Sequence, residues 1–538
     1  MLKTQIIKPI KTLGKSLAAL TLFFSSFTLF YSSNQAQNQD NNPNNSFIER
    51  LKSTSITREE LSTVQDDKTL KLNLKDAINL TLENNRTLKD AYLQRIIDRE
   101  DLAQANALYT PELTPTIDFN LNRNRILSGA EIADSGNLNL GGSVFFLIPT
   151  GATIRANLDA TGASGNRNTI DFFRVDNSLE QNFNVTFTQP LFRGFGTAIT
   201  NIPIVRAEGQ EDINLLDLKD TLINTITETI RAYRSLIQAQ ESLKIQQQAL
   251  ERAKAQLKFT QILIEAGRRA RVDIIQNQTQ VAERELTLLQ AKNTLKNQQL
   301  NLIQALDIDR DFQIIAIDIP QSEALTQAQP LKPKELLQLA FINNPNYLRN
   351  LINIDLNRLS LLEAKDDNRW QLDLILQYSN DLDILSTDLG NSNVSAALFL
   401  SKDFFGNRAL QRNIIRFQVT LDQSLIRLEE RKENLTIDVE NGIRQVNFTL
   451  QQAKQARVAR ILAAQRLQIE QEKQRLGRGS LFELITFEQN LVDAQNRELN
   501  AIIDYLNQLT SLNQTLGITL DIWDIQFDRL SVVNDEKS

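Results

Sequence analysis

Two seven-residue segments carry the charged side chains whose spacing most strongly suggests chemistry. One begins with glycine and ends with Asp273, and the other, 210 positions later, begins with glycine and ends with Glu483. Each glycine predicts the left-handed end of one helix, and each carboxylate then lies near the start of the next helix. Arginines after the glycines could pair with these carboxylates within or between chains; plain helix capping is the alternative. The candidate residues are Gly267, Arg268, Asp273, Gly477, Arg478, Gly479, Ser480 and Glu483.

Composition excludes most other chemistry. The 538 residues include no His and no Cys, and Met1 is the only Met. Ser–His–Asp catalysis, Cys–His catalysis and zinc sites of thiolates or imidazoles are therefore excluded. A hydrolase would need a carboxylate pair in a compact pocket, and no segment that predicts a pocket carries one. We expect neither an enzyme nor a cofactor or metal site. A net charge of −6 with 59 Lys and Arg is also too balanced for a nucleic-acid binder.

The elements that hold these segments occur twice. Residues 74–85 return 259 positions later as residues 333–344, whereas the two glycine segments lie 210 positions apart. The first copy therefore carries about 49 more residues than the second, and both copies should follow one plan. We place the first repeat at residues 70–320 and the second at 321–527. A tail follows at 528–538.

The N-terminal region predicts export. Four lysines between residues 3 and 15 precede a short apolar run, which predicts a signal peptide at residues 1–36. A membrane anchor is the alternative, although polar residues interrupt the run and it is short for a spanning helix. Residues 37–69 are expected to form a disordered leader, because the stretch from Asn34 to Asn45 is rich in Asn and Gln.

Most of the remaining chain is expected to be helical. Helices are expected at residues 202–266 and 272–306, where apolar residues recur every seven positions from Leu243 to Ile264 and from Val281 to Leu302, and residues 411–476 and 481–516 follow suit, which is typical of coiled coils. Residues 74–108 and 333–367 predict one shorter helix in each copy. A helix of about 65 residues is about 95 Å long, which equals two short helices end to end. Each long helix should therefore run beside a stacked pair.

Between these helices the apolar period changes to two, which predicts strands at about residues 113–192 and 371–403. One face is apolar and the other carries Asn, Asp, Thr and Ser. So few strands cannot cover such a face, and a closed transmembrane barrel needs about eight or more. Several chains should therefore contribute to one barrel, which lipid covers on one face and water on the other. A soluble two-sheet sandwich is the alternative. The extra 49 residues contain a hairpin signal, Pro149–Thr150–Gly151, and either extend the barrel or lie outside it.

The order of these helices, strands and motifs resembles that of the TolC-type outer-membrane efflux protein family. Members of this family are the outer membrane factors of tripartite efflux or type I secretion. The resemblance rests on the duplicated opening at residues 77–85, on Thr-Gln-Pro-Leu-Phe-Arg-Gly at 188–194, on the two glycine segments and on Gln-Thr-Leu-Gly at 514–517. It covers about residues 70–527. The second copy departs from the pattern, because Ser401 to Gly406 lacks the usual proline.

The resemblance implies a mixed α/β membrane protein. The duplicated helix–strand–strand–helix–helix repeat would form a trimeric transmembrane β-barrel, continued by a long antiparallel α-helical coiled-coil tunnel in the periplasm. Such a homotrimer is the passive exit duct of an efflux pump or type I secretion system in the outer membrane of a Gram-negative-type bacterium. Its partners would be a periplasmic adaptor and an inner-membrane transporter. A periplasmic coiled-coil scaffold without a pore is the alternative.

For the glycine segments, the resemblance implies adaptor docking and gating. Family members often close the periplasmic mouth with acidic rings, whose positions fall on Glu483 and Thr486 in this sequence. One carboxylate is thus kept and the other is missing. Trp370 at the start of a strand could join an interfacial aromatic belt. The cargo, and the choice between efflux and protein secretion, stay open.

Overall fold

The structure is a computed structural model that describes residues 69–126, 131–166, 179–268, 270–318, 331–383, 390–403, 406–476 and 478–525. The predicted signal peptide, all of the predicted leader except Thr69, and the predicted tail lie outside these ranges. The chain divides into two units, Met1–Leu70 with Asp311–Gln313, and Lys71–Arg310 with Ile314–Ser538. The elements described below belong to the second unit, except for the ends of two short strands.

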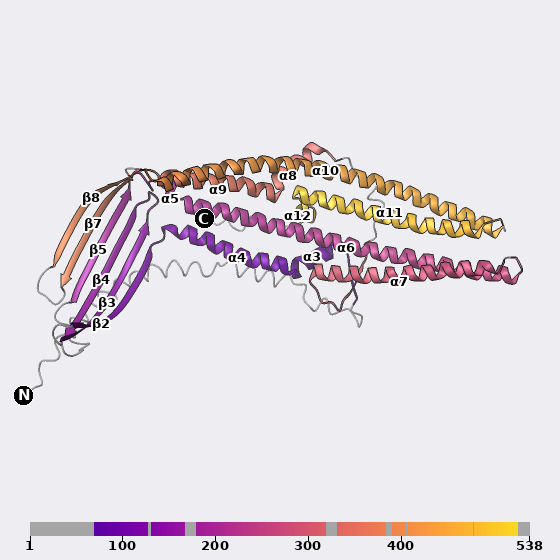
Figure 1. The fold of residues 1–538 in the computed structure, drawn as a ribbon, viewed down its shortest axis with the longest axis horizontal. Helices are drawn as coiled ribbons and strands as arrows, with labels where there is room; N and C mark the ends of the chain where they lie inside the picture. The colour runs from indigo at the N-terminus through magenta and orange to yellow at the C-terminus, as the bar shows by residue number, and fades with distance from the viewer. Residues whose placement is uncertain are drawn as a thin grey trace, which may run out of the picture. The chain divides into compact units, whose positions relative to one another are not determined.

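Four long helices form two antiparallel hairpins (Figure 1). In the first repeat α6 (Ile202–Glu265) turns back as α7 (Val272–Leu306), and in the second α10 (Arg408–Arg475) turns back as α11 (Leu481–Leu516). The four predicted helices are thus confirmed to within three residues at each end. Each hairpin packs along its length, as the seven-residue apolar repeats require.

The shorter predicted helices are each broken in two. The first consists of α3 (Leu74–Asn84) and α4 (Arg86–Asn106), and the second of α8 (Pro333–Asn343) and α9 (Pro345–Asp367). The expectation of one continuous helix in each place is wrong. An asparagine at each break has non-helical backbone and caps the following helix, and proline opens α9. As predicted, α6 runs beside α3, α4 and α7, and α10 runs beside α8, α9 and α11.

The two breaks are held in the same way. The side-chain Nδ2 of Asn85 donates to the carbonyl of Ala305 at 3.0 Å, and that of Asn344 donates to Thr515 at 2.9 Å. The asparagines lie 259 positions apart and their acceptors 210, the two offsets of the sequence duplication. The repeat is therefore reproduced at the level of single hydrogen bonds.

In the part of the chain that the structure describes, six antiparallel strands form one sheet in the order β2-β3-β4-β5-β7-β8. The first repeat supplies four of them and the second supplies β7 and β8. The Pro149–Thr150–Gly151 turn joins β3 to β4, which lie between β2 and β5. The extra hairpin is therefore part of the sheet and not an excursion outside it. The bounds are β2 Glu112–Ile126, β3 Glu131–Leu147, β4 Thr153–Asn166, β5 Leu179–Pro190, β7 Gln371–Asp383 and β8 Asn391–Ser401.

Several small elements were not expected from the sequence. Strands β1 (Thr69–Leu72) and β6 (Gln313–Ala316) pair with each other. The Tyr233 hydroxyl of α6 lies 2.9 Å from both the Leu72 carbonyl and the Asp318 carboxylate, next to these strands. The remaining elements are the 3-10 turn η2 (Ala107–Tyr109), α5 (Thr197–Thr200) and α12 (Thr519–Ile522). Within the described ranges, no helix combines the length and apolar content needed to cross a bilayer.

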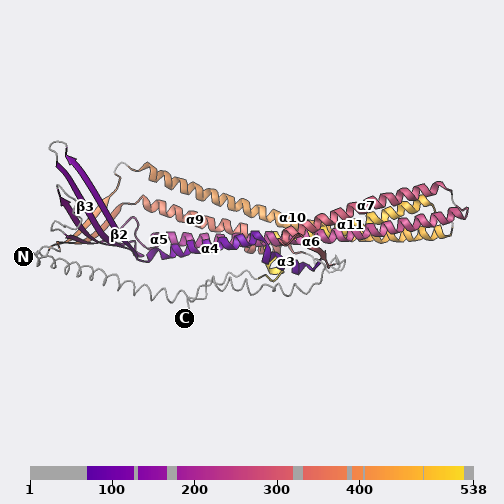
Figure 2. The ribbon, with the colours of Figure 1, turned by 90° about the horizontal axis from the view of Figure 1, so that it is seen from below.

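Each repeat has its own apolar core where its long helix meets its broken one. The first core packs α3 and α4 on the middle of α6, and the second packs α8 and α11 on the middle of α10. Fully buried members of the first are Leu88, Ile223, Ile226 and Ile230, and those of the second are Ala340, Leu435, Val439 and Ala453. Two views agree that both hairpin tips lie at the end of this unit remote from the sheet (Figures 1 and 2).

Candidate functional site

The first hairpin tip is closed by a glycine-dependent helix end. Gly267 has φ +71°, its N–H donates to the carbonyl of Ile264 at 3.0 Å, and the Arg268 N–H donates to Leu263 at 2.8 Å. These two bonds satisfy the last carbonyls of α6, and a left-handed residue without a β-carbon makes them easy to form. The left-handed turn expected at Gly267 is confirmed.

The return helix is tied to α6 just beyond this turn. Asp273 lies in the first turn of α7, and its N–H donates to Ala270 at 3.1 Å. The buried Asn277 side chain donates to the Asp273 carbonyl at 2.8 Å and lies 3.2 Å from the Thr260 hydroxyl of α6. Asp273 thus occupies the predicted place at the positive end of a helix.

The second tip is closed by close backbone contact. Gly477 lies outside the described residues. The Arg478 N–H donates to the Lys473 carbonyl at 2.9 Å, which matches the bond from Arg268 to Leu263 in the first tip. A β-carbon on Gly479 would lie 2.7 Å from the backbone N and Cα of Gln474. Only glycine fits there without displacing the end of α10.

A buried carboxylate, which the sequence analysis missed, anchors the second tip. Glu470 is 1% exposed; one oxygen accepts the Ser480 N–H at 3.2 Å and the other lies 3.2 Å from the Lys473 ammonium. Hydrogen bonds and an ion pair together make burial of a charge tolerable. Ser480, the N-cap residue of α11, is therefore held through its backbone.

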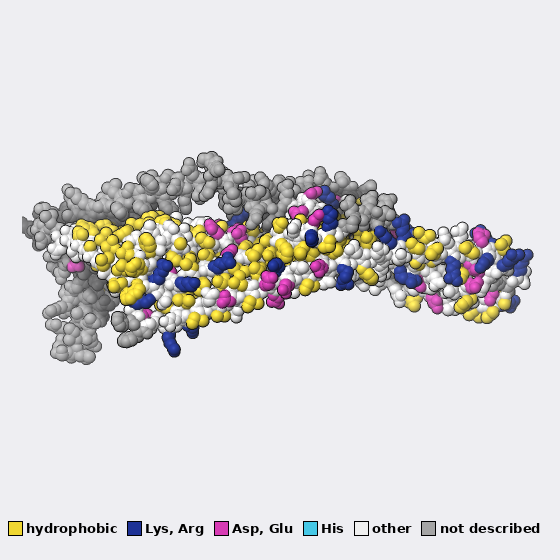
Figure 3. Space-filling model, turned by 90° about the horizontal axis from the view of Figure 1, so that it is seen from above, with side chains coloured by type: hydrophobic (Ala, Val, Ile, Leu, Met, Phe, Trp, Pro, Cys, Tyr) yellow, Lys and Arg dark blue, Asp and Glu magenta, His cyan; other side chains and the backbone are white. Residues whose placement is uncertain are grey.

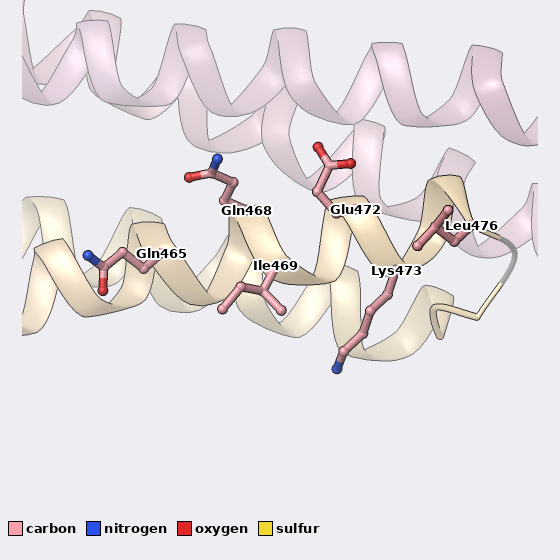
Figure 4. Close-up of a pocket in the computed structure, with 6 residues that line it drawn as sticks. All are labelled: Gln465, Gln468, Ile469, Glu472, Lys473 and Leu476. Carbon is pink, nitrogen blue, oxygen red and sulfur yellow. The ribbon is translucent and has the colours of Figure 1, made fainter.

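The outward surface of the tips mixes charge with exposed apolar side chains. Glu483 is exposed in the first turn of α11, and among the described residues it pairs with neither Arg268 nor Arg478. A shallow groove of about 500 Å³ follows the last turns of α10, and its lining includes Ile469, Glu472 and Leu476 (Figure 4). Exposed apolar residues near the turns include Val272, Ile275, Leu476 and Phe482.

Polar side chains join the two hairpins along α6 and α11. Arg234 of α6 donates to the Leu506 carbonyl and to the Thr510 hydroxyl, both at 2.7 Å, and Gln238 donates to Asn500 at 2.8 Å. Burial, with Arg231 nearby, lowers the pKa of Arg234 to about 10, so it stays cationic at neutral pH. We call this α6–α11 contact the polar seam.

Toward the tips, a buried charge cluster lies where α6, α7 and α11 meet. The buried Arg284 guanidinium donates to the Gln489 side chain at 2.7 Å, and Arg252 contributes a second, half-buried cation. Burial raises the pKa of Glu488 above its ordinary value, while Arg252 and Arg284 partly oppose the rise. Among the described residues, Arg252 has buried nitrogens without a hydrogen-bond partner. Burying charged groups that are only partly paired costs free energy, so this cluster weakens the contact between the two hairpins.

A second missed carboxylate lies where sheet and helices join. Asp366 near the end of α9 is buried; its oxygens accept the Gly194 N–H at 2.7 Å and the Arg369 guanidinium at 3.1 Å. Gly194 ends the Thr-Gln-Pro-Leu-Phe-Arg-Gly motif, so the motif forms the junction that follows β5. Trp370 is half exposed beside this junction, and its carbonyl accepts the Arg193 N–H at 3.2 Å. Its place in an aromatic belt stays a prediction.

These clusters join helices to one another and to nearby backbone through hydrogen bonds and ion pairs. Across the described ranges, no three carboxylates lie close enough together to hold a metal ion.

The fold is that of solved outer-membrane channels. It is similar to VceC from Vibrio cholerae (13% identity, TM-score 0.60, covering 82% of this chain and 96% of that one). It is also similar to CmeC from Campylobacter jejuni (14% identity, TM-score 0.57, covering 83% of this chain and 85% of that one). The open state of MtrE from Neisseria gonorrhoeae is similar as well (14% identity, TM-score 0.59, covering 83% of this chain and 89% of that one).

The sequence points to the same class. Residues 157–307 match the family model described as outer membrane efflux protein. The resemblance to the TolC-type outer-membrane efflux family inferred from the motifs is therefore confirmed. A search of curated protein sequences found no match to this chain.

Proposed function

We propose that this protein is the outer-membrane exit duct of a tripartite efflux pump or a type I secretion system. Three copies would enclose a water-filled conduit through the outer membrane and across the periplasm. Energy would come from an inner-membrane transporter, reached through a periplasmic adaptor. The observation that carries the proposal is a sheet with one apolar and one polar face, joined directly to paired coiled-coil helices.

The two faces of the sheet support a place in lipid. Cross-strand neighbours lie on the same face, and Val185, Tyr378 and Val394 form one apolar row across β5, β7 and β8. Asn184, Ser379 and Asn393 form the adjacent polar row. Lipid can cover the first face and water the second only if the sheet closes on itself.

An exposed apolar stripe on α10 supports assembly with further copies. Four large side chains recur every eleven residues, which is three helical turns, so they line up along one face. Figure 3 shows hydrophobic side chains gathered on one face of the protein. The four residues and their exposed fractions are Ile415 64%, Ile426 70%, Ile437 53% and Phe448 61%. We call this row the α10 stripe. A neighbouring copy of the chain would remove it from water, whereas a monomer leaves it exposed.

The tips are proposed as the gate and adaptor-docking region. Glu483 would face the equivalent carboxylates of the other copies in a closed mouth. The charge interactions among them would then depend on the residue at that position. The exposed apolar residues beside the turns would supply the contact area for an adaptor. The polar seam and the charge cluster would set how easily one hairpin moves against the other.

Fractionation tests the assembly. Expressed in a Gram-negative host, the full chain should appear in the outer membrane, require detergent for extraction, and run as a trimer that heating converts to monomer. A periplasmic scaffold without a pore would instead be released in buffer without detergent.

A further inference from the structure

The strand order shows that each copy supplies more strands than two matching repeats would. The second repeat contributes two strands, and a matching first repeat would make four per chain. The first repeat contributes four instead, because β3 and β4 are inserted between β2 and β5. The described residues of each chain therefore offer six strands to a barrel.

The inserted hairpin has the same faces as its neighbours. On the apolar face, Leu140 of β3 lies opposite Ile117 of β2 and Ala160 of β4. On the polar face, Asn139 lies opposite Asp118 and Thr161. A hairpin folded outside the barrel would have no reason to continue both faces in register. β3 and β4 are thus wall strands like the others.

The two end strands suit each other. β2 and β8 end the described sheet order, and all 11 residues of β8 are exposed. An even number of antiparallel strands makes β2 and β8 run in opposite directions, so β8 of one copy can pair antiparallel with β2 of the next. Long open edges are an aggregation hazard, and head-to-tail pairing that closes a ring removes them all.

We propose that three copies close an eighteen-stranded barrel, with six strands each, by pairing β8 of one copy with β2 of the next. This rests on the trimeric conduit proposed above and adds the partner surface and the width of the lumen. With strands ~4.8 Å apart and tilted ~40°, eighteen strands give a backbone diameter of about 36 Å, against about 24 Å for twelve. The size limit on cargo then falls on the helical part and its tips.

Disulfide cross-linking tests the edge pairing directly, because the chain has no Cys of its own. Asp118→Cys on β2 is combined in turn with Asn393→Cys, Ser395→Cys or Ala397→Cys on β8, all on the polar face. The pair in register should convert most of the detergent-solubilised trimer into a covalent trimer on oxidation, since Cα atoms of facing residues lie within disulfide reach. Asp118→Cys with Val394→Cys, which places the second thiol on the opposite face, is the control and should stay unlinked.

Electron cryo-microscopy of the unmodified trimer gives a readout independent of register. Eighteen strands and a diameter near the wider estimate are expected. A trimer with a twelve-stranded barrel and β3 and β4 outside it would overturn the strand count, and a trimer in which no β2–β8 pair cross-links would overturn the edge pairing; either result would leave the conduit intact. A protein that forms no trimer at all would instead overturn the proposed function.

Discussion

The α10 stripe allows the contact between copies to be perturbed by a calculable amount. Ile426 is 70% exposed in the single chain. Full burial of an isoleucine side chain stabilises by about 1.5–3 kcal/mol, so covering the exposed part should contribute about 1–2 kcal/mol at each contact. A ring of three copies has three contacts. Ile426→Asp should therefore cost about 3–6 kcal/mol per trimer, or about a hundred- to ten-thousandfold in the assembly constant.

The assay is native mass spectrometry of protein in mild detergent over a series of concentrations. The trimer should dissociate at concentrations at which the unmodified protein stays assembled, while the helical circular dichroism is unchanged. Ile426→Leu keeps the apolar volume and is the control that should behave as the unmodified protein. Ile426→Asp trimers that persist to the same dilution would refute the claim that the stripe is a contact between copies.

Three further predictions concern the tips. Glu483→Ala should raise basal conductance and sensitivity to large antibiotics, because it removes the proposed gate charge; Glu483→Asp is the control, and unchanged conductance in a folded Glu483→Ala variant would remove this residue from the gate. Gly479→Val should weaken adaptor binding more than trimer stability, because its side chain meets the Gln474 backbone at 2.7 Å; equal losses of both would contradict a docking role. Since burial raises the pKa of Glu488, tip stability should be greatest below the ordinary glutamate value of 4.5 and fall as pH rises through the raised pKa. Glu488→Gln should abolish that fall in melting temperature between pH 4 and pH 8, and an identical pH profile would exclude Glu488 as its cause.

The long helices were predictable because apolar residues recur every seven positions within them, for example from Leu243 to Ile264 in α6 and from Val281 to Leu302 in α7. The breaks at Asn85 and Asn344 were not, although both lie in the duplicated opening. In the sequence these asparagines only mark the repeat, whereas in the structure they cap the following helix and turn the backbone. Pro345, directly after the second asparagine, was the available signal.

The sheet shows where pattern reasoning stops. Alternation identified the strands, including those of the extra hairpin, but a period of two says nothing about which strand pairs with which. The position of β3 and β4 between β2 and β5 depends on contacts between chain segments, and these have no local signature.

The sites were predicted unevenly for the same reason. Gly267 and Asp273 followed from local helix-end chemistry, and the structure places both as expected. Glu470 and Asp366 could not be predicted, because their carboxylates accept hydrogen bonds from backbone N–H groups that lie ten or more residues away in the sequence. The sequence did hold a signal for the charge cluster: Arg284 lies three residues after Val281, at the second seam position of that heptad, where a charge is unusual.

Single-channel recording tests the central claim most directly. The full chain, purified in detergent and inserted into a planar lipid bilayer, should produce discrete conductance steps, and Glu483→Ala should shift them toward longer or larger openings. Protein that is trimeric and inserted but passes no current, in both forms, would contradict the account of a water-filled conduit.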